Sequence, residues 1–135
     1  MAINETPTLE DVVGGLYSGP MLVDQAFRFE LDPNNLQATS MAQHAGAARF
    51  AFNWGLEQRK RRLEAGEGTT DAMAQHREWN EFKRENARWW TEVSKCAPQE
   101  ALRDLDKAMR SFFKSRRAAG SRKVGFPRFK CKGRD

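Results

Sequence analysis

The chain has 135 residues, which is enough for one domain with an appended tail, and its four Trp and nine Phe are enough to build a packed core. No run of 18 apolar residues is present, which excludes a membrane-spanning helix, and the N-terminus has no basic and apolar leader, so we expect a cytoplasmic protein. Cys96 and Cys131 lie far apart and neither is near a histidine, so we expect free thiols, no zinc site and no other cofactor.

The net charge of +5 is distributed unevenly along the chain. Residues 1–24 contain four acids and no Lys or Arg, which gives −4, whereas residues 107–135 contain eleven Lys or Arg and one acid, which gives +10. Such asymmetry indicates a polyanionic partner. We therefore expect nucleic acid as the partner, and neither a membrane nor a small-molecule substrate.

The first 24 residues differ from the rest in composition. They contain three Gly and two Pro and show no sustained hydrophobic period. This predicts an acidic, disordered tail at residues 1–24, followed by a nucleic-acid-binding domain at residues 25–132. Met21 is an alternative start of the natural protein.

The domain is predicted to open with a strand. Between Ala26 and Leu31, hydrophobic residues alternate with charged ones, which is typical of a half-buried strand over residues 26–31. Asp32 and Pro33 should end this strand and start a helical region over residues 33–118, with Asp32 as N-cap and Pro33 as the first helical residue.

The first predicted helix is central to the domain. Ala45–Leu56 alternates like a strand, but a helical wheel places Phe50 and Trp54 on the face opposite Phe52. The flanking alanines favour a helix that is apolar on both sides, as in the centre of a bundle, with a kink or break at Gly46.

Two further helices are predicted. Thr70 can cap a helix of about Asp71–Asn86, and the last helix begins near Pro98 and ends at Gly120. The hydrophobic residues of the last helix recur at helical spacing. They are Leu102, Leu105, Met109, Phe112 and Phe113.

The domain is predicted to close with a second strand over residues 124–132. Phe129 and Cys131 alternate with basic residues, and Pro127 indicates an edge strand or a bulge. A strand near each end, with helices between, predicts that the two strands pair. The expected fold class is therefore mainly α, with a bundle of three to four helices inserted between two short paired strands.

The last predicted helix carries a row of cations at positions i, i+4, i+7, i+11 and i+14. The row consists of Arg103, Lys107, Arg110, Lys114 and Arg117. Like charges one turn apart repel unless something neutralises them, and this row continues into the following segment. The continuation consists of Arg122, Lys123, Arg128, Lys130, Lys132 and Arg134. A solvated helix face is the alternative, but the continuous row favours phosphate contacts along helix and strand.

A second basic cluster ends the central helix and consists of Arg59, Lys60, Arg61 and Arg62. Cations there also stabilise a helix C-terminus through the helix dipole, so the sequence leaves both roles open. Most aromatic residues fall on apolar faces and are expected in the core. Trp89 and Trp90 cannot both point inward from a regular helix, so one of them is a candidate for base stacking.

No catalytic site is expected in this chain. His44 and His76 lie in polar helical contexts without an obvious catalytic partner. Acidic residues such as Asp104 and Asp106 lie on predicted helix surfaces, whereas a metal-dependent nuclease needs acids that converge from rigid strands. We therefore expect neither an enzyme nor a metal site.

Four sequence blocks form a pattern that is specific in its order and spacing. They are Ala26–Phe29 ahead of Asp32-Pro33, Arg49–Trp54, Ala101–Ala108 followed by Phe112–Lys114, and Val124–Lys130. This pattern, over about residues 25–132, resembles the OrfB/TnpB family of transposon-encoded RNA-guided nucleases, which are compact relatives of type V CRISPR effectors. Asp32 departs from the family pattern, which usually has an aromatic residue there, and the acidic tail is extra.

The resemblance implies a helix-turn-helix associated with transposition, strands of a wedge-like β-barrel and helices of a recognition lobe. Together these would hold a guide RNA, its heteroduplex with target DNA and a short flanking duplex, while base pairing reads the sequence. The family's RuvC-like nuclease and zinc ribbon would lie beyond this chain, so the resemblance carries over no catalytic residue.

Three functions remain open from the sequence. The first is the nucleic-acid-binding N-terminal portion of a TnpB-like RNA-guided DNA nuclease, with guide RNA and target DNA as partners. The second is a stand-alone DNA-binding regulator of the helix-turn-helix type, derived from a transposase. The third is a helical protein-interaction domain whose basic end docks an acidic protein.

Overall fold

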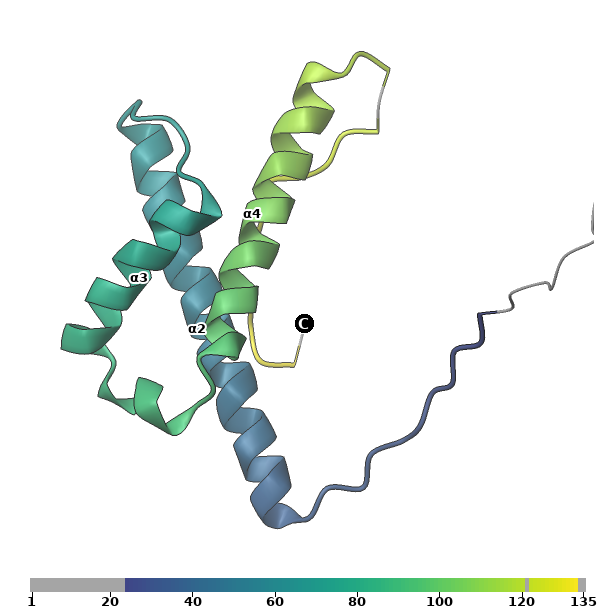
Figure 1. Cartoon of the computed structure of the whole chain (residues 1–135). Coiled ribbons are helices and arrows are strands. Elements are labelled where there is room, and N and C mark those ends of the chain that lie inside the picture. The colour runs from purple at the N-terminus through teal and green to yellow at the C-terminus, as the bar shows by residue number, and fades with distance from the viewer. Residues whose placement is uncertain (1–23, 121, 134–135) are drawn as a thin grey trace, which may run out of the picture. The chain divides into compact units, whose positions relative to one another are not determined.

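The computed structural model describes residues 24–120 and 122–133, and this part of the chain is helical (Figure 1). The helices are α2 (Asn35–Glu64), α3 (Ala72–Asn86), the 3-10 helix η1 (Arg88–Glu92) and α4 (Cys96–Arg117). The chain divides into two units, residues 1–32 and 33–135, and all of these helices belong to the second. The predicted tail at residues 1–24, including Met21, lies outside the described residues except for Asp24.

Helix α2 begins two residues later than predicted. Asn34, not Asp32, is its N-cap: Asn34 Oδ1 accepts from the Gln37 N–H (3.0 Å), and Gln37 Oε1 accepts from the Asn34 N–H (3.0 Å). This capping box satisfies two donors that the start of a helix leaves unpaired. The helix then runs for 30 residues, so the predicted break at Gly46 is wrong. One interior glycine costs only about 1 kcal/mol relative to alanine, too little to interrupt a helix held by packing on both sides.

The two-faced character predicted for the central helix is confirmed (Figure 1). One face of α2 packs against α4 through a buried cluster of Phe52, Leu56, Leu105 and Met109. Another face contributes to a second cluster, shared with α3 and α4, of Ala51, Trp79 and Leu102 with Trp54 and Phe82 around it. Helix α2 is therefore the axis on which the other two helices are assembled.

Gly55 lets α4 approach α2 closely. A Cβ placed on Gly55 would lie 2.7 Å from Leu102 Cδ2 and 2.9 Å from Leu105 Cδ2, both of which are fully buried. The backbone carbonyl of Gly55 also accepts a hydrogen bond from Gln75 Nε2 of α3 (2.8 Å). The second glycine of α2 therefore has a packing role that its helix propensity does not show.

The predicted strand at residues 26–31 is absent. In the described residues of the first unit the chain is extended but forms no β-ladder, and Phe27 and Phe29 are 73% and 85% exposed. Alternation shows only that a segment could bury one face. A strand also requires a neighbour that pairs with its backbone N–H and C=O groups.

The predicted strand at residues 124–132 forms no β-ladder with the described residues, and parts of its backbone pair with side chains instead. Asn53 of α2 donates from Nδ2 to the Lys130 carbonyl (3.0 Å) and accepts at Oδ1 from the Lys130 N–H (2.8 Å). The Val124 N–H donates to Ser115 Oγ of α4 (3.1 Å), and Phe126 packs against the core. One amide side chain thus makes the pair of bonds that a neighbouring strand would make. The described residues therefore form a helical fold, and the prediction of two paired strands was wrong.

Candidate nucleic-acid interface

A buried network of charged and polar side chains joins the three α-helices. Arg59 of α2 is 2% exposed, and its guanidinium donates to Gln75 Oε1 of α3 (2.8 Å) and to Asp106 Oδ1 of α4 (3.1 Å). The second carboxylate oxygen of Asp106 accepts from Arg110, one turn further along α4. Buried charges are tolerated only when they are paired and hydrogen-bonded, and this network meets that condition.

The basic cluster at the end of α2 is engaged within the protein. Burial takes Arg59 out of the surface set that the sequence predicted to contact phosphate. The other three members each contact another side chain. These contacts are Lys60 over the Phe129 ring (5.4 Å to its centre), Arg61 with Glu57 (2.9 Å) and Arg62 with Glu78 (2.6 Å). The helix-stabilising role that the sequence left open fits this cluster better.

The row of cations on α4 divides into two parts. Its N-terminal members pair with acids three or four residues earlier on the same helix. The pairs are Arg103 with Glu100 (2.5 Å), Lys107 with Asp104 (3.2 Å) and Arg110 with Asp106. These acids supply the neutralisation that like charges one turn apart require. Arg103 and Lys107 are therefore neutralised within α4. Asp106 also pairs with the buried Arg59, so one positive charge remains at Arg110.

The C-terminal part of the basic surface is different. Five of its exposed cations have no ion pair with any of the residues that the structure describes. They are Lys114, Arg117, Arg122, Arg128 and Lys132. We call these five residues the basic end. They follow the end of α4 into the segment that returns along it, and Arg134 lies outside the described residues.

The two remaining predicted contacts have structural interactions. Lys123 Nζ donates to the backbone carbonyls of Ser115 (3.1 Å) and Ala118 (3.5 Å), which satisfies acceptors at the C-terminus of α4. Lys130 Nζ lies 5.2 Å from the centre of the Phe52 ring, and its backbone is held by Asn53. Both lysines thus help to fix the segment at residues 122–132, which returns along α4 and carries Arg122, Arg128 and Lys132 of the basic end.

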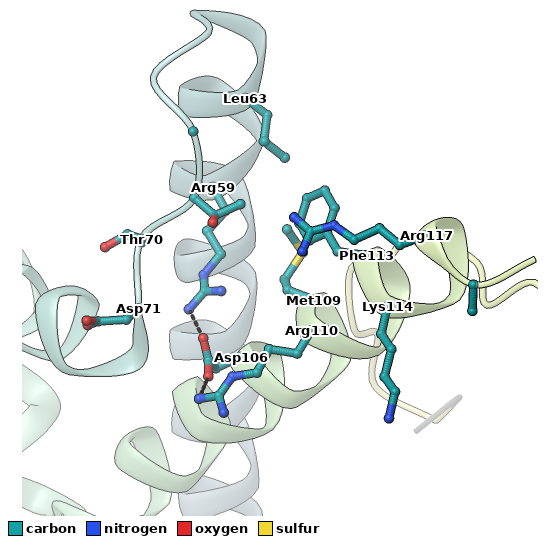
Figure 2. A pocket seen from close by; sticks show the side chains of 13 residues that line it. Arg59, Leu63, Thr70, Asp71, Asp106, Met109, Arg110, Phe113, Lys114 and Arg117 are labelled. Carbon is teal, nitrogen blue, oxygen red and sulfur yellow. Dashed lines mark hydrogen bonds and ion pairs between the residues drawn. The ribbon is translucent and has the colours of Figure 1, made fainter.

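A groove of about 830 Å³ lies between the C-terminal ends of α2 and α4 and the loop at residues 68–71 (Figure 2). Its apolar lining consists of Leu63, Met109 and Phe113, and its charged lining includes Arg110, Lys114, Arg117, Asp106 and Asp71. The Asp71 carboxylate is the N-cap of α3, where Oδ1 accepts from the Ala74 N–H (2.7 Å). The groove therefore joins an apolar surface to one end of the basic surface.

Most aromatic side chains belong to the packing, as the sequence predicted. Phe50 contacts the rings of Trp79, Phe82 and Trp89, with centroid distances of 6.0, 6.2 and 5.4 Å. The Trp90 ring contacts Lys83 instead, whose ammonium lies 4.4 Å from the centre of the ring. Burial, together with the nearby cations Arg84 and Lys95, lowers the pKa of Lys83.

No metal-binding group of three or more His, Cys, Asp or Glu residues occurs in the described parts of the chain. His44 Nε2 accepts from the Ser94 N–H (2.9 Å), and His76 Nε2 lies 3.3 Å from the Gln99 carbonyl. Both histidines thus join helices to neighbouring segments. Among the described residues, no helix is long and apolar enough to cross a membrane.

Sequence reasoning missed three residues that organise this region. Asp106 was placed on a solvated helix face, although the structure buries it, and neither Asn53 nor Gln75 was singled out. The sequence does carry a signal for Arg59. It continues the buried row Ala47, Ala51, Gly55 at intervals of four residues.

The sequence has relatives among known proteins. A family described as a helix-turn-helix domain, of the OrfB IS605 type, matches residues 21–68. In the described part of that range the chain forms the single helix α2, not two helices joined by a turn. The match therefore identifies a sequence family without the local geometry that its description names.

Two curated relatives carry the name of an RNA-guided nuclease. "Putative RNA-guided DNA endonuclease Rv2885c" of Mycobacterium tuberculosis (strain H37Rv) is 39% identical over 125 residues, and the match covers 82% of this chain and 27% of the relative. "Putative RNA-guided DNA endonuclease InsQ" of Escherichia coli (strain K12) is 35% identical over 112 residues, covering 82% of this chain and 26% of the relative. The chain spans about a quarter of the length of these relatives. These matches show that residues 21–68 are similar to the OrfB IS605 helix-turn-helix family and that the chain is similar to about a quarter of two proteins named as RNA-guided DNA endonucleases.

Proposed function

We propose that this chain binds nucleic acid as part of an RNA-guided DNA endonuclease and holds guide RNA and target DNA through contacts to their backbones. The observation that carries the proposal is the basic end, whose five exposed cations have no ion pair among the described residues. Both relatives are named as RNA-guided DNA endonucleases, and these names are the reason for proposing guide RNA and target DNA as the nucleic acids.

The position of the basic end argues for an external anion. Cations in the last turn of a helix are favoured by its dipole, which accounts for Lys114 and Arg117 without a partner. Arg122, Arg128 and Lys132 lie beyond the helix, where the dipole no longer acts. Their mutual repulsion would be relieved by phosphate groups, which arginine and lysine bind well.

Burial of α2 favours backbone contacts over reading in a major groove. A recognition helix must present one face to the base edges of DNA. The middle of α2 instead packs against α3 and α4, and it buries Ala51, Phe52, Leu56 and Arg59. This supports the RNA-guided role, in which base pairing reads the sequence, over a stand-alone regulator.

Competition between nucleic acids tests the proposal. The chain would be titrated against a fluorescent structured RNA at about 50 mM salt, with unlabelled duplex DNA and RNA–DNA heteroduplex of equal phosphate number as competitors. We expect the heteroduplex to compete at least as well as the DNA duplex. A preference for duplex DNA would favour the function of a stand-alone DNA-binding regulator. If the chain bound none of the three nucleic acids, only the function of a protein-interaction domain would remain.

A further inference from the structure

We infer that the groove between the ends of α2 and α4 receives an unstacked base of a single-stranded nucleic-acid segment, with the flanking phosphates on the adjacent cations. This inference rests on the proposed function, since it names the form of nucleic acid that one part of the basic surface would bind. It is carried by the combination of an apolar floor and a cationic rim in one groove.

The floor of the groove is suited to a flat apolar group. Leu63 from α2 meets Met109 and Phe113 from α4 there (Figure 2). A volume of about 830 Å³ lies within the range of about 300–1,000 Å³ that is typical of ligand sites. Phosphate alone would leave this apolar surface uncovered, whereas a base has an apolar face that can cover it.

The rim holds one guanidinium in a fixed position. Arg110 donates to Asp106, whose other carboxylate oxygen is held by the buried Arg59 (3.1 Å) (Figure 2). One carboxylate between two guanidinium groups leaves this trio with a net charge of +1. The remaining N–H groups of Arg110 are therefore pre-oriented beside the groove for an anion, together with Lys114 and Arg117.

The same features disfavour other occupants. A duplex keeps its bases in the stack and offers a groove little besides sugar and phosphate. An acidic peptide could also join apolar and anionic groups, but further exposed cations follow α4 in the chain at Arg122, Arg128 and Lys132, and a phosphate backbone can contact many cations in succession. The pocket of about 330 Å³ beside Phe50 and Trp89 has aromatic walls, but its only charged lining residue is the acid Glu92.

An abasic ligand separates base binding from phosphate binding. Fluorescence anisotropy at one fixed salt concentration would compare oligouridylate, an abasic strand and a duplex, all with the same number of phosphates. We expect oligouridylate to bind about 5- to 150-fold more tightly than the abasic strand, the range that stacking of one base provides. Equal affinity for these two strands would overturn the inference and leave the proposed function intact, whereas no binding to any ligand would refute the proposed function itself.

Two matched variants test whether the base binds in this groove. Phe113→Leu removes a ring from the groove, and Phe50→Leu removes one from the aromatic cluster outside it. We expect Phe113→Leu alone to reduce the preference for oligouridylate over the abasic strand. A larger loss in Phe50→Leu would place the base elsewhere and contradict the inference. Displacement of oligouridylate by an acidic, leucine-containing peptide of equal charge, as effectively as by unlabelled oligouridylate, would also overturn it. If Phe113→Leu fails to fold, the comparison of ligands on the unaltered chain still decides.

Discussion

Arg59 of α2 and Asp106 of α4 form an ion pair of 3.1 Å in which neither side chain is more than 6% exposed. Each belongs to a stretch of sequence that reads as a polar helix surface, yet together they lie between the two main helices. Asp106 in turn holds the exposed Arg110, so a buried contact between helices also fixes a cation at the surface. The structural and the proposed functional roles of this region therefore share one carboxylate.

Loss of this carboxylate charge should destabilise the fold strongly. Asp106→Asn leaves Arg59 buried without a counter-charge, and we expect a loss of about 3–5 kcal/mol in the free energy of unfolding. Asp104→Asn on the same helix breaks an exposed pair with Lys107 and should cost at most about 1 kcal/mol. Urea unfolding of both variants measures the difference. Similar stabilities for the two would show that the buried pair is not needed.

The two glycines of α2 should respond in opposite ways to alanine. Gly46→Ala gains helix propensity and its Cβ meets no atom within 4 Å, so we expect stabilisation by about 0.5–1 kcal/mol. Gly55→Ala forces the buried Leu102 and Leu105 to move, at a cost of about 1–3 kcal/mol that exceeds the gain in propensity. Thermal unfolding of both variants provides the measurement. Stabilisation by Gly55→Ala would mean that the leucines can shift freely.

Asn53 should determine how firmly residues 124–131 are held against α2. Asn53→Ala removes both hydrogen bonds to the Lys130 backbone, each worth about 0.5–1.5 kcal/mol. Amide hydrogen exchange should then accelerate at residues 124–131 more than in α2 or α4. The matched control is Asn86→Ala, because among the described residues the Asn86 side chain bonds to a carbonyl of its own helix alone, that of Phe82 (3.1 Å). Unchanged exchange in Asn53→Ala would show that other contacts hold residues 124–131 in place.

The packing of the helices was predictable, but the pairing of polar groups was not. Helical spacing of Phe52, Leu105 and Met109 predicted which helix faces are buried, and these residues form the α2–α4 core. The spacing of residues 26–31 and 124–132 described equally well a strand or an extended segment without a ladder. Which of the two forms depends on partners distant in sequence, such as Asn53, and alternation carries no information about them.

The candidate interface was predictable only in its general location. A row of five cations on one helix face indicated an anion-binding surface, but its first three members pair with the acids Glu100, Asp104 and Asp106. Those acids were visible in the sequence at distances of three and four residues. The spacing of Arg59 from Ala51 and Gly55 indicated a buried face, but its hydrogen-bond partners on α3 and α4 are distant in sequence.

Cations of α4 that form ion pairs within the helix should contribute less to DNA binding than those that do not. We expect the double variant Lys114→Ala/Arg117→Ala to reduce the salt dependence of DNA binding by about two units of slope, since each lost phosphate contact accounts for about 0.9. Arg103→Ala/Lys107→Ala removes the same charge from ion-paired positions and should change the slope by less than about half as much. Equal effects of the two double variants would contradict the division of the row.

The salt dependence of binding by the unaltered chain tests the central claim most directly. If the five residues of the basic end contact phosphates, log Kd plotted against log salt concentration between 50 and 200 mM should rise with a slope of about 4–5 for duplex DNA. Replacement of all five by alanine should abolish most of that slope while the helical circular dichroism is retained. A slope near zero for the unaltered chain, or an unchanged slope in the five-fold variant, would contradict the assignment of this surface.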